Sequence, residues 1–215
     1  MEETQKKASF WIRLLFSKTL REKNSAHRIA YISIVTALNV VANFVEIKFL
    51  DTQFSFTILL SLLSGVTLGA LAGFASGFIG DLLGVIFRGW LYMPWVGLST
   101  ATFALLSGIC VEFLPLRFKG GLALRMALAC LLSFAVCTIA INSTGFYYYN
   151  KAMDFSTAIV DFANKHFGAE QVTYWIYVAY RLFFKGQIWN SLVNYVLFFV
   201  LMPVLMRIKQ LKIKI

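Results

Sequence analysis

The chain has 215 residues, of which 59% are hydrophobic and 14% are charged, and its mean hydropathy is +0.72. Soluble domains carry about 25% charged residues, so this composition indicates an integral membrane protein. A chain of this length supplies about six membrane crossings of about 20 residues each, which leaves no room for a soluble catalytic domain. We therefore expect an all-α fold in which six transmembrane helices form a single domain.

Residues 1–28 form a basic segment that precedes the first apolar run. The segment lacks the continuous apolar core of a signal peptide, so we expect it to stay attached to the protein. Its stretch FWIRLLFSKTLR, residues 10–21, alternates aromatic and aliphatic side chains with basic ones. This pattern predicts a short amphipathic helix on an anionic membrane surface.

Six apolar runs predict the membrane-spanning helices of a domain covering residues 29–206, which a basic tail at 207–215 follows. The predicted spans are 29–46, 54–68, 69–88, 95–114, 122–143 and 182–206. The second and third runs are fused into one block that is too long for a single helix. We therefore expect a tight helical hairpin that turns between Gly65 and Gly69.

The net charge of +10 could indicate a nucleic-acid partner, but its distribution indicates a membrane topology instead. Fourteen of the 20 Lys and Arg residues fall before the first predicted span, around the connection between the fourth and fifth, or after the last. These positions share one side of a six-span arrangement, and the positive-inside rule makes that side the cytoplasm. We expect cytoplasmic termini, an external connection at 144–181, and no nucleic-acid partner.

Six glycines occur three or four residues apart in GVTLGALAGFASGFIGDLLG, residues 65–84. A phosphate-binding loop would need a Lys followed by Ser or Thr, or a strand and a turn in water, and neither context exists here. Glycines at this spacing lie on one helix face and allow a second helix to approach closely. The stretch therefore predicts helix packing.

Asp81 is the one acid placed deep in a predicted span. A carboxylate there costs about 2.5–3.5 kcal/mol, so it should face a partner or a polar cavity rather than lipid. A structural bond to Arg88 or to a nearby hydroxyl and a contact with a ligand both stay open as its role.

The stretch RGWLYMPWVGLST, residues 88–100, is predicted to lie outside the membrane. An interfacial aromatic belt explains its Trp and Tyr residues but not an arginine at the end of a glycine-rich helix. A guanidinium there suits an anionic or heteroaromatic ligand. Arg88, Tyr92 and Trp95 are therefore candidate substrate contacts.

The segment 142–185 contains many aromatic residues and is long for a connection in a compact protein, which favours a functional role. Apolar residues at helical spacing within 152–167 predict an amphipathic helix that covers the outer mouth as a lid. Arg181 and Lys185 lie one turn apart, where they could extend to the interface or bind an anion. The candidate contacts from this segment are Asn142, Tyr147, Trp175, Arg181 and Lys185.

No catalytic, metal or cofactor site is predicted. The sequence contains no HExxH motif and no serine in a nucleophile elbow, so we do not expect an enzyme. His166 has Asp161 and Glu170 nearby but no second histidine. The three cysteines, which we expect to be small core residues, match no metal or redox spacing. They are Cys110, Cys130 and Cys137.

Several short motifs resemble those of the S components of energy-coupling factor (ECF) transporters. They are ISIVTAL in the first span, the glycine block ending in GDLLG, YMPWVGLS at 92–99, and RLFFK at 181–185. The folate-type branch is the most similar. The resemblance implies a vitamin-binding subunit of the bacterial plasma membrane that has no ATPase of its own.

The resemblance also implies partners, namely a membrane T subunit and two cytoplasmic ATPase subunits, which use the ATP. Small residues of the first helix would dock on the T subunit. The matching positions are Ala26, Ala30, Ser33 and Ala37. Folate is the expected vitamin, although Val66 replaces a proline that the family often has and the external segment is long, which leaves cobalamin or another vitamin open.

Two other functions are compatible with the sequence. A self-sufficient carrier would be expected to show internal repeats and several intramembrane acids, whereas this chain has Asp81 alone. A structural membrane protein would carry the aromatic residues only as an interfacial belt.

Overall fold

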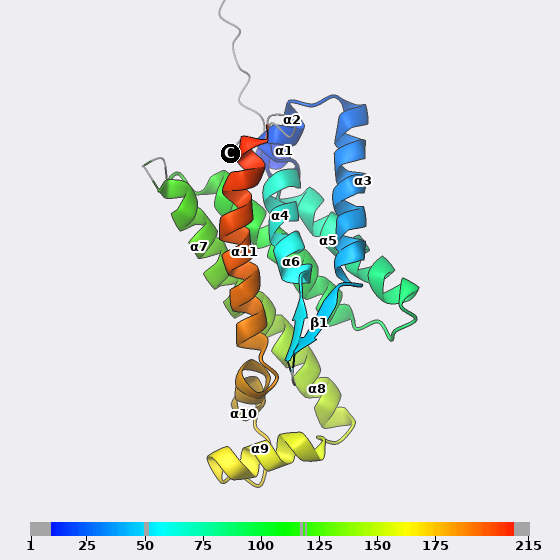
Figure 1. The fold of residues 1–215 in the computed structure, drawn as a ribbon, viewed down its shortest axis with the longest axis vertical. Coiled ribbons are helices and arrows are strands. Elements are labelled where there is room, and N and C mark those ends of the chain that lie inside the picture. The colour runs from blue at the N-terminus through cyan, green and yellow to red at the C-terminus, as the bar shows by residue number, and fades with distance from the viewer. Residues whose placement is uncertain (1–9, 50–51, 117, 119, 209–215) are drawn as a thin grey trace, which may run out of the picture.

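The computed structural model describes residues 10–49, 52–116, 118 and 120–208, which form an elongated helical bundle (Figure 1). Five helices of this part of the chain are long and apolar enough to cross a membrane. They are α3 (Ser25–Ala42), α5 (Ala70–Phe87), α6 (Pro94–Phe113), the continuous helix Gly121–Ala152, and α11 (Gln187–Arg207). The remaining predicted span, 54–68, forms the shorter apolar helix α4 (Thr57–Leu68).

The N-terminal segment forms two short helices rather than the single one expected over residues 10–21. They are α1 (Phe10–Leu15) and α2 (Lys18–Arg21). Ser17 separates them because its side chain accepts a hydrogen bond from the Leu20 amide and caps α2. The Ser17 hydroxyl also donates to the Thr67 carbonyl at 2.6 Å, and the Ser17 amide donates to the Leu68 carbonyl at 2.8 Å. These bonds hold the segment against the end of α4.

The first span begins and ends earlier than predicted, at Ser25 and Ala42 instead of 29 and 46. An antiparallel hairpin of β1 (Glu46–Phe49) and β2 (Thr52–Ser55) follows it, with Glu46 opposite Ser55. The all-α prediction is therefore correct for the bundle but missed this hairpin. EIKF alternates polar and apolar residues whereas TQFS does not, and each is too short to be separated from the neighbouring apolar runs by pattern alone.

The predicted hairpin of α4 and α5 is confirmed, and its turn lies at Gly69. Gly69 has φ +106°, a conformation that favours glycine, and an added Cβ would lie 2.4 Å from the Ser17 amide nitrogen. Past the turn, a Cβ on Gly73 would lie 2.7 Å from Gly65 Cα. The glycine block therefore does what its spacing predicted and brings the two helices into backbone contact.

The fifth predicted span, 122–143, continues past its expected end. It consists of α7 (Gly121–Ser133), the π-helical segment η1 (Phe134–Ser143) and α8 (Thr144–Ala152). The rest of the predicted external connection is also largely helical, as α9 (Thr157–Phe167), α10 (Tyr174–Ala179) and the π-helical turn η2 (Tyr180–Phe184). Gly186, with φ +66°, separates η2 from α11. Arg181 and Lys185 thus precede the last long helix instead of opening it at 182.

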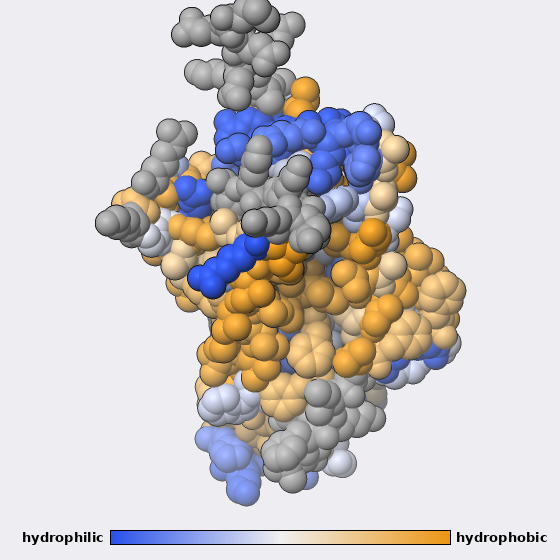
Figure 2. Space-filling view, turned by 45° about the horizontal axis from the view of Figure 1, so that its top comes forward, coloured by the Kyte–Doolittle hydropathy of each residue, from blue (hydrophilic) through white to orange (hydrophobic). Residues whose placement is uncertain are grey.

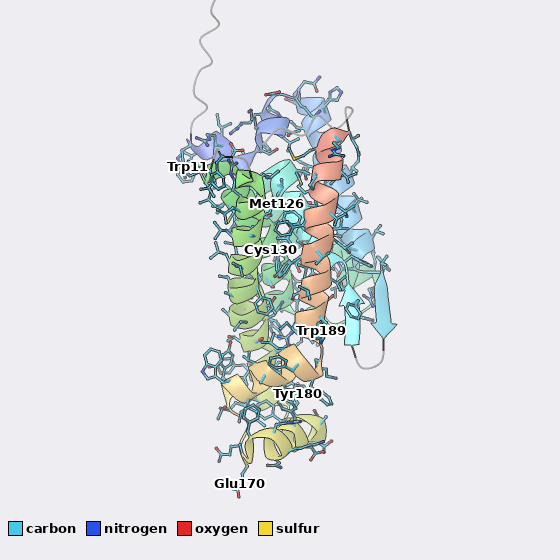
Figure 3. All side chains as sticks on the ribbon, turned by 60° about the vertical axis from the view of Figure 1, so that its left-hand side comes forward. Trp11, Met126, Cys130, Glu170, Tyr180 and Trp189 are labelled. Carbon is cyan, nitrogen blue, oxygen red and sulfur yellow. The ribbon has the colours of Figure 1, made fainter. Side chains whose placement is uncertain are left out.

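The core joins α4, α7 and α11, where Leu62, Met126, Phe198 and Met202 are fully or almost fully buried. The three cysteines are buried and unpaired, which confirms them as core residues. In Figure 3, Trp11 and Glu170 lie at opposite ends of the molecule. Figure 2 shows hydrophilic residues at both ends of the molecule and an apolar surface between them, as expected of a protein that crosses a membrane.

Candidate functional site

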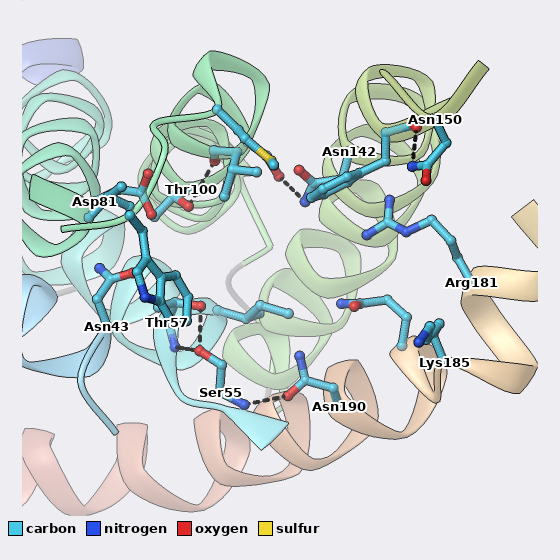
Figure 4. Close-up of a pocket in the computed structure, with 18 of the residues that line it drawn as sticks. Asn43, Ser55, Thr57, Asp81, Thr100, Asn142, Asn150, Arg181, Lys185 and Asn190 are labelled. Atoms are coloured by element: carbon cyan, nitrogen blue, oxygen red, sulfur yellow. Dashed lines mark hydrogen bonds between the residues drawn. The ribbon is translucent and has the colours of Figure 1, made fainter. Parts of the chain in front are cut away.

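A cavity of about 700 Å³ opens among the ends of the helices on the α8 to α10 side of the molecule (Figure 4). This volume is in the range of sites that bind small organic molecules. Five of the nine predicted substrate contacts line it. They are Asp81, Arg88, Asn142, Arg181 and Lys185. Asp81 and Lys185, which are 104 positions apart in the sequence, therefore meet in one cavity.

Asp81 and Asn142 form a polar end of the cavity that is rich in hydrogen-bond acceptors. Asp81 is 3% exposed and lies beside the Thr100 hydroxyl, which donates to the Val96 carbonyl at 3.0 Å. Asn142 donates from Nδ2 to Ser99 Oγ at 2.9 Å. Asp81 Oδ2 and Asn142 Oδ1 are buried and accept no hydrogen bond within the described part of the chain. Such atoms are costly to bury unless a ligand supplies donors.

Tyr92 lies behind Asp81 rather than in the cavity wall. A Cβ added to Gly97 would lie 2.2 Å from the Tyr92 hydroxyl oxygen and 3.2 Å from Asp81 Oδ2, so the two side chains meet over this glycine. Burial and the nearby carboxylate both raise the pKa of Tyr92 above its usual value, which keeps its hydroxyl protonated at neutral pH. The structure therefore places Tyr92 near Asp81 but outside the cavity wall.

Arg88 connects the end of α5 to the end of α3. Its guanidinium donates to the Asn43 carbonyl and lies over the Trp90 ring, with Cζ 3.4 Å from the ring centroid. Asn43, Arg88 and Trp90 all line the cavity. The arginine thus shapes one wall and presents a cationic face to it.

Arg181 and Lys185 form the opposite, cationic end. Arg181 donates from Nη1 to Ser143 Oγ at 3.3 Å, and its Cζ lies 4.5 Å from the Phe146 ring centroid. Lys185 is exposed, with Nζ 6.0 Å from the Tyr180 ring centroid. Burial lowers the pKa of Arg181 from its usual value, because a buried guanidinium is less well solvated than an exposed one.

Three further predicted contacts lie outside the cavity wall. Trp95 packs against Phe146 and Tyr149, with ring centroids 5.8 and 5.9 Å apart. Tyr147 belongs to an aromatic cluster with Tyr174 and Tyr177, and Trp175 is 70% exposed. The structure therefore does not bring these three residues together with the five predicted contacts that line the cavity.

The predicted amphipathic helix of the external connection exists as α9, which crosses the end of the molecule (Figure 1). Ile159 and Ala163 are buried on its inner face, and Ile159 packs with Tyr177 and Tyr180. Ile159 also lines the cavity. The helix therefore contributes directly to the wall.

Sequence reasoning missed several amides in the wall, among them Asn150 and Asn190. Asn190 Oδ1 accepts a hydrogen bond from the Ser55 amide at 3.0 Å. One turn later, Asn194 accepts from the Leu59 amide at 3.0 Å and donates to the Ser55 carbonyl at 2.8 Å. The sequence signal that could have indicated this connection between α11 and the start of α4 is the pair of asparagines four residues apart in a mostly apolar run.

The small residues predicted for partner docking all lie on one helix, away from the cavity. Ala26, Ala30, Ser33 and Ala37 are exposed on α3. Large apolar residues of the same helix, Ile29, Ile34, Leu38 and Val41, are exposed beside them. The opposite side of α3 packs against α5 and α4, where Asn39 donates to Ser64 Oγ at 2.8 Å.

One family of known proteins matches the chain. The family model described as ECF-type riboflavin transporter, S component, matches residues 23–169, which is more than half of the chain. The matched segment begins just before α3 and ends just after α9, so it includes the acceptor-rich end of the cavity and precedes the cationic end. No curated protein matches.

Proposed function

The chain belongs to the family of ECF-type riboflavin transporter S components, and from this premise we propose that its cavity binds a vitamin with a flat heteroaromatic ring. S components are substrate-binding subunits of transporters and not enzymes. Riboflavin is the first ligand to test because the family description names it. Folate is the second, because the sequence motifs resemble the folate-type branch.

The buried acceptors Asp81 Oδ2 and Asn142 Oδ1 are the observation that carries this proposal. Riboflavin and folate both present ring N–H groups, which would satisfy these acceptors at the closed end of the cavity. Aromatic side chains in the wall, among them Phe146, Tyr177 and Tyr180, offer surfaces for the ring. Cobalamin is much larger than either vitamin and fits a cavity of about 700 Å³ least well.

Delivery of the vitamin across the bacterial plasma membrane would depend on partner subunits. We propose that the exposed small residues of α3, Ala26 to Ala37, dock on a membrane T subunit that couples the protein to two cytoplasmic ATPases. The cavity would then face the outside and both termini the cytoplasm. The described ends of the chain lie together at the end of the molecule opposite α9, which supports this orientation (Figure 1).

Ligand identification tests the proposal. The protein is purified in detergent, bound small molecules are identified by mass spectrometry, and riboflavin and folate are titrated by flavin fluorescence and by calorimetry. We expect nanomolar binding of one of them. If no vitamin co-purifies and none binds, a vitamin-binding function is wrong. Uptake into vesicles that contain this protein without any ATPase would instead identify a self-sufficient carrier.

A further inference from the structure

Among the described residues of the cavity wall, the charges are unbalanced and separated. One of them, Asp81, is an acid, whereas Arg88, Arg181 and Lys185 are cations. Asp81 and Arg181 lie on opposite sides of the cavity in Figure 4. The carboxylate is therefore placed to satisfy one end of a ligand and not to neutralise the cationic end.

Among the residues that the structure describes, Arg181 and Lys185 also form no ion pair with a carboxylate. The ion pairs found among the residues that the structure describes both involve Glu112, at the far end of α6. The neighbours of Arg181 are the Ser143 hydroxyl and the Phe146 ring, which hold the guanidinium in place without cancelling its charge. A half-buried cation with neutral partners is stabilised when an anion binds to it.

The start of α11 adds a second, independent attraction for an anion. The N-cap of this 21-residue helix is Gly186, and no side chain caps its first amides. Gln187 and Asn190, from the first turn of α11, line the cavity next to Lys185. The positive end of a long helix thus points to the same region as the two cations.

We propose that the cavity selects a cargo with an oxyanion at one end: the heteroaromatic ring lies at Asp81 and Asn142, and a phosphate or carboxylate lies at Arg181, Lys185 and the start of α11. This inference rests on the proposed vitamin-binding function and specifies the chemical class of the ligand. Arg181 would bind the oxyanion through its planar fork, and Lys185 would add a mobile point charge at the entrance.

Two matched ligand pairs test the proposal and separate the two oxyanions. Riboflavin is compared with riboflavin 5′-phosphate, and folate with its glutamate dimethyl ester, which lacks the two negative charges. Dissociation constants are measured at low salt for the purified full-length protein. In the pair that binds, we expect the charged member to bind at least about tenfold more tightly, the difference made by one charge-assisted hydrogen bond.

Variants then assign the preference to the cationic end. Arg181→Met and Lys185→Met should each reduce the ratio between charged and neutral ligand, and Arg181→Lys should restore part of it. Lys151→Met is the matched control, because Lys151 is an exposed cation on α8 outside the cavity wall. Lys185 is exposed too, so its variant is expected to fold even if a change at Arg181 disturbs the protein.

The possible failures are distinguishable. Equal affinity for the charged and neutral members of the binding pair would overturn the oxyanion proposal and leave vitamin binding intact. An undiminished preference in both methionine variants would overturn the assignment to Arg181 and Lys185. Lack of binding by all four ligands would overturn the proposed function and this inference together.

Discussion

Arg21 on α2 and Glu112 on α6 form an ion pair with 2.8 Å between Nη2 and Oε1. The two side chains are 17% and 15% exposed, so the pair is largely removed from water. Arg13 on α1 reaches the same carboxylate at 3.5 Å, but its side chain is 43% exposed. The Glu112 carboxylate on α6 therefore holds both short N-terminal helices against the bundle. Its contact with Arg21 is shorter and more deeply buried than its contact with Arg13.

The difference in burial between the two ion pairs predicts that replacing each arginine by methionine changes the stability of the protein by different amounts. Arg21→Met should lower the free energy of unfolding by about 1–3 kcal/mol, because it leaves Glu112 largely buried with a weaker partner. Arg13→Met should cost less than about 1 kcal/mol, as expected of an exposed pair. Thermal unfolding in detergent measures both. Equal effects of the two variants would show that burial does not determine the strength of this contact.

The approach of α4 to α6 gives a second prediction. A Cβ on Gly65 would lie 1.9 Å from the Ala104 carbonyl oxygen, which belongs to a helix backbone and cannot move alone. Gly65→Ala should therefore destabilise the protein by about 1–3 kcal/mol or prevent folding. Gly77→Ala is the control, since its Cβ would lie 3.2 Å from the Thr100 carbonyl oxygen and helix propensity favours alanine. Similar melting temperatures for the two variants would contradict this ranking.

The glycine block shows how much of the fold could be predicted. The length of the fused apolar block indicated the hairpin, and the glycine spacing indicated its packing role. The spacing could not identify the partners, since Gly65 meets α6 and Gly69 meets Ser17, contacts that depend on the three-dimensional path. The sequence also could not predict where each helix ends, because π-helical turns such as η1 and η2 leave no simple periodic signal.

The sequence indicated residues of the cavity wall where charge is unusual and missed them where the side chain is neutral. Asp81 and Arg181 stand out because a charge near an apolar span needs a reason, and both line the cavity. Trp175 was chosen for its type, but tryptophan is common at membrane surfaces whatever the function, and it is exposed. Asn190 was missed because a neutral amide in a span costs less than a charge.

Asn194 links α11 to the start of α4, which yields a third prediction. It is 1% exposed and satisfies both the Leu59 amide and the Ser55 carbonyl. Asn194→Leu leaves both groups without this partner, at a cost of about 1–3 kcal/mol each. Asn164→Leu makes the same chemical change on the exposed side of α9 and should alter stability by less than about 0.5 kcal/mol.

Melting temperatures in detergent compare the two asparagine variants. Because Ser55 and Asn190 line the cavity, the loss of this connection in Asn194→Leu should also displace part of the wall and weaken ligand binding. If Asn194→Leu is as stable as the control, water or a neighbouring group replaces the amide, and the connection is not important for the fold.

Asp81→Asn decides between the two roles that the sequence left open for this carboxylate. The substitution keeps the shape of the side chain and removes a buried charge that is costly in a membrane protein, so the melting temperature should hold or rise. A direct contact between Asp81 Oδ2 and a ligand N–H is a charge-assisted hydrogen bond, and its loss should weaken binding about 10- to 100-fold. Thr100→Val, which removes the neighbouring hydroxyl but keeps the shape, should weaken binding much less, because it affects only how the carboxylate is held. If Asp81→Asn instead lowers the melting temperature and leaves the dissociation constant unchanged, the carboxylate braces the helices around the cavity, and the ring must be held by Asn142 and the aromatic wall.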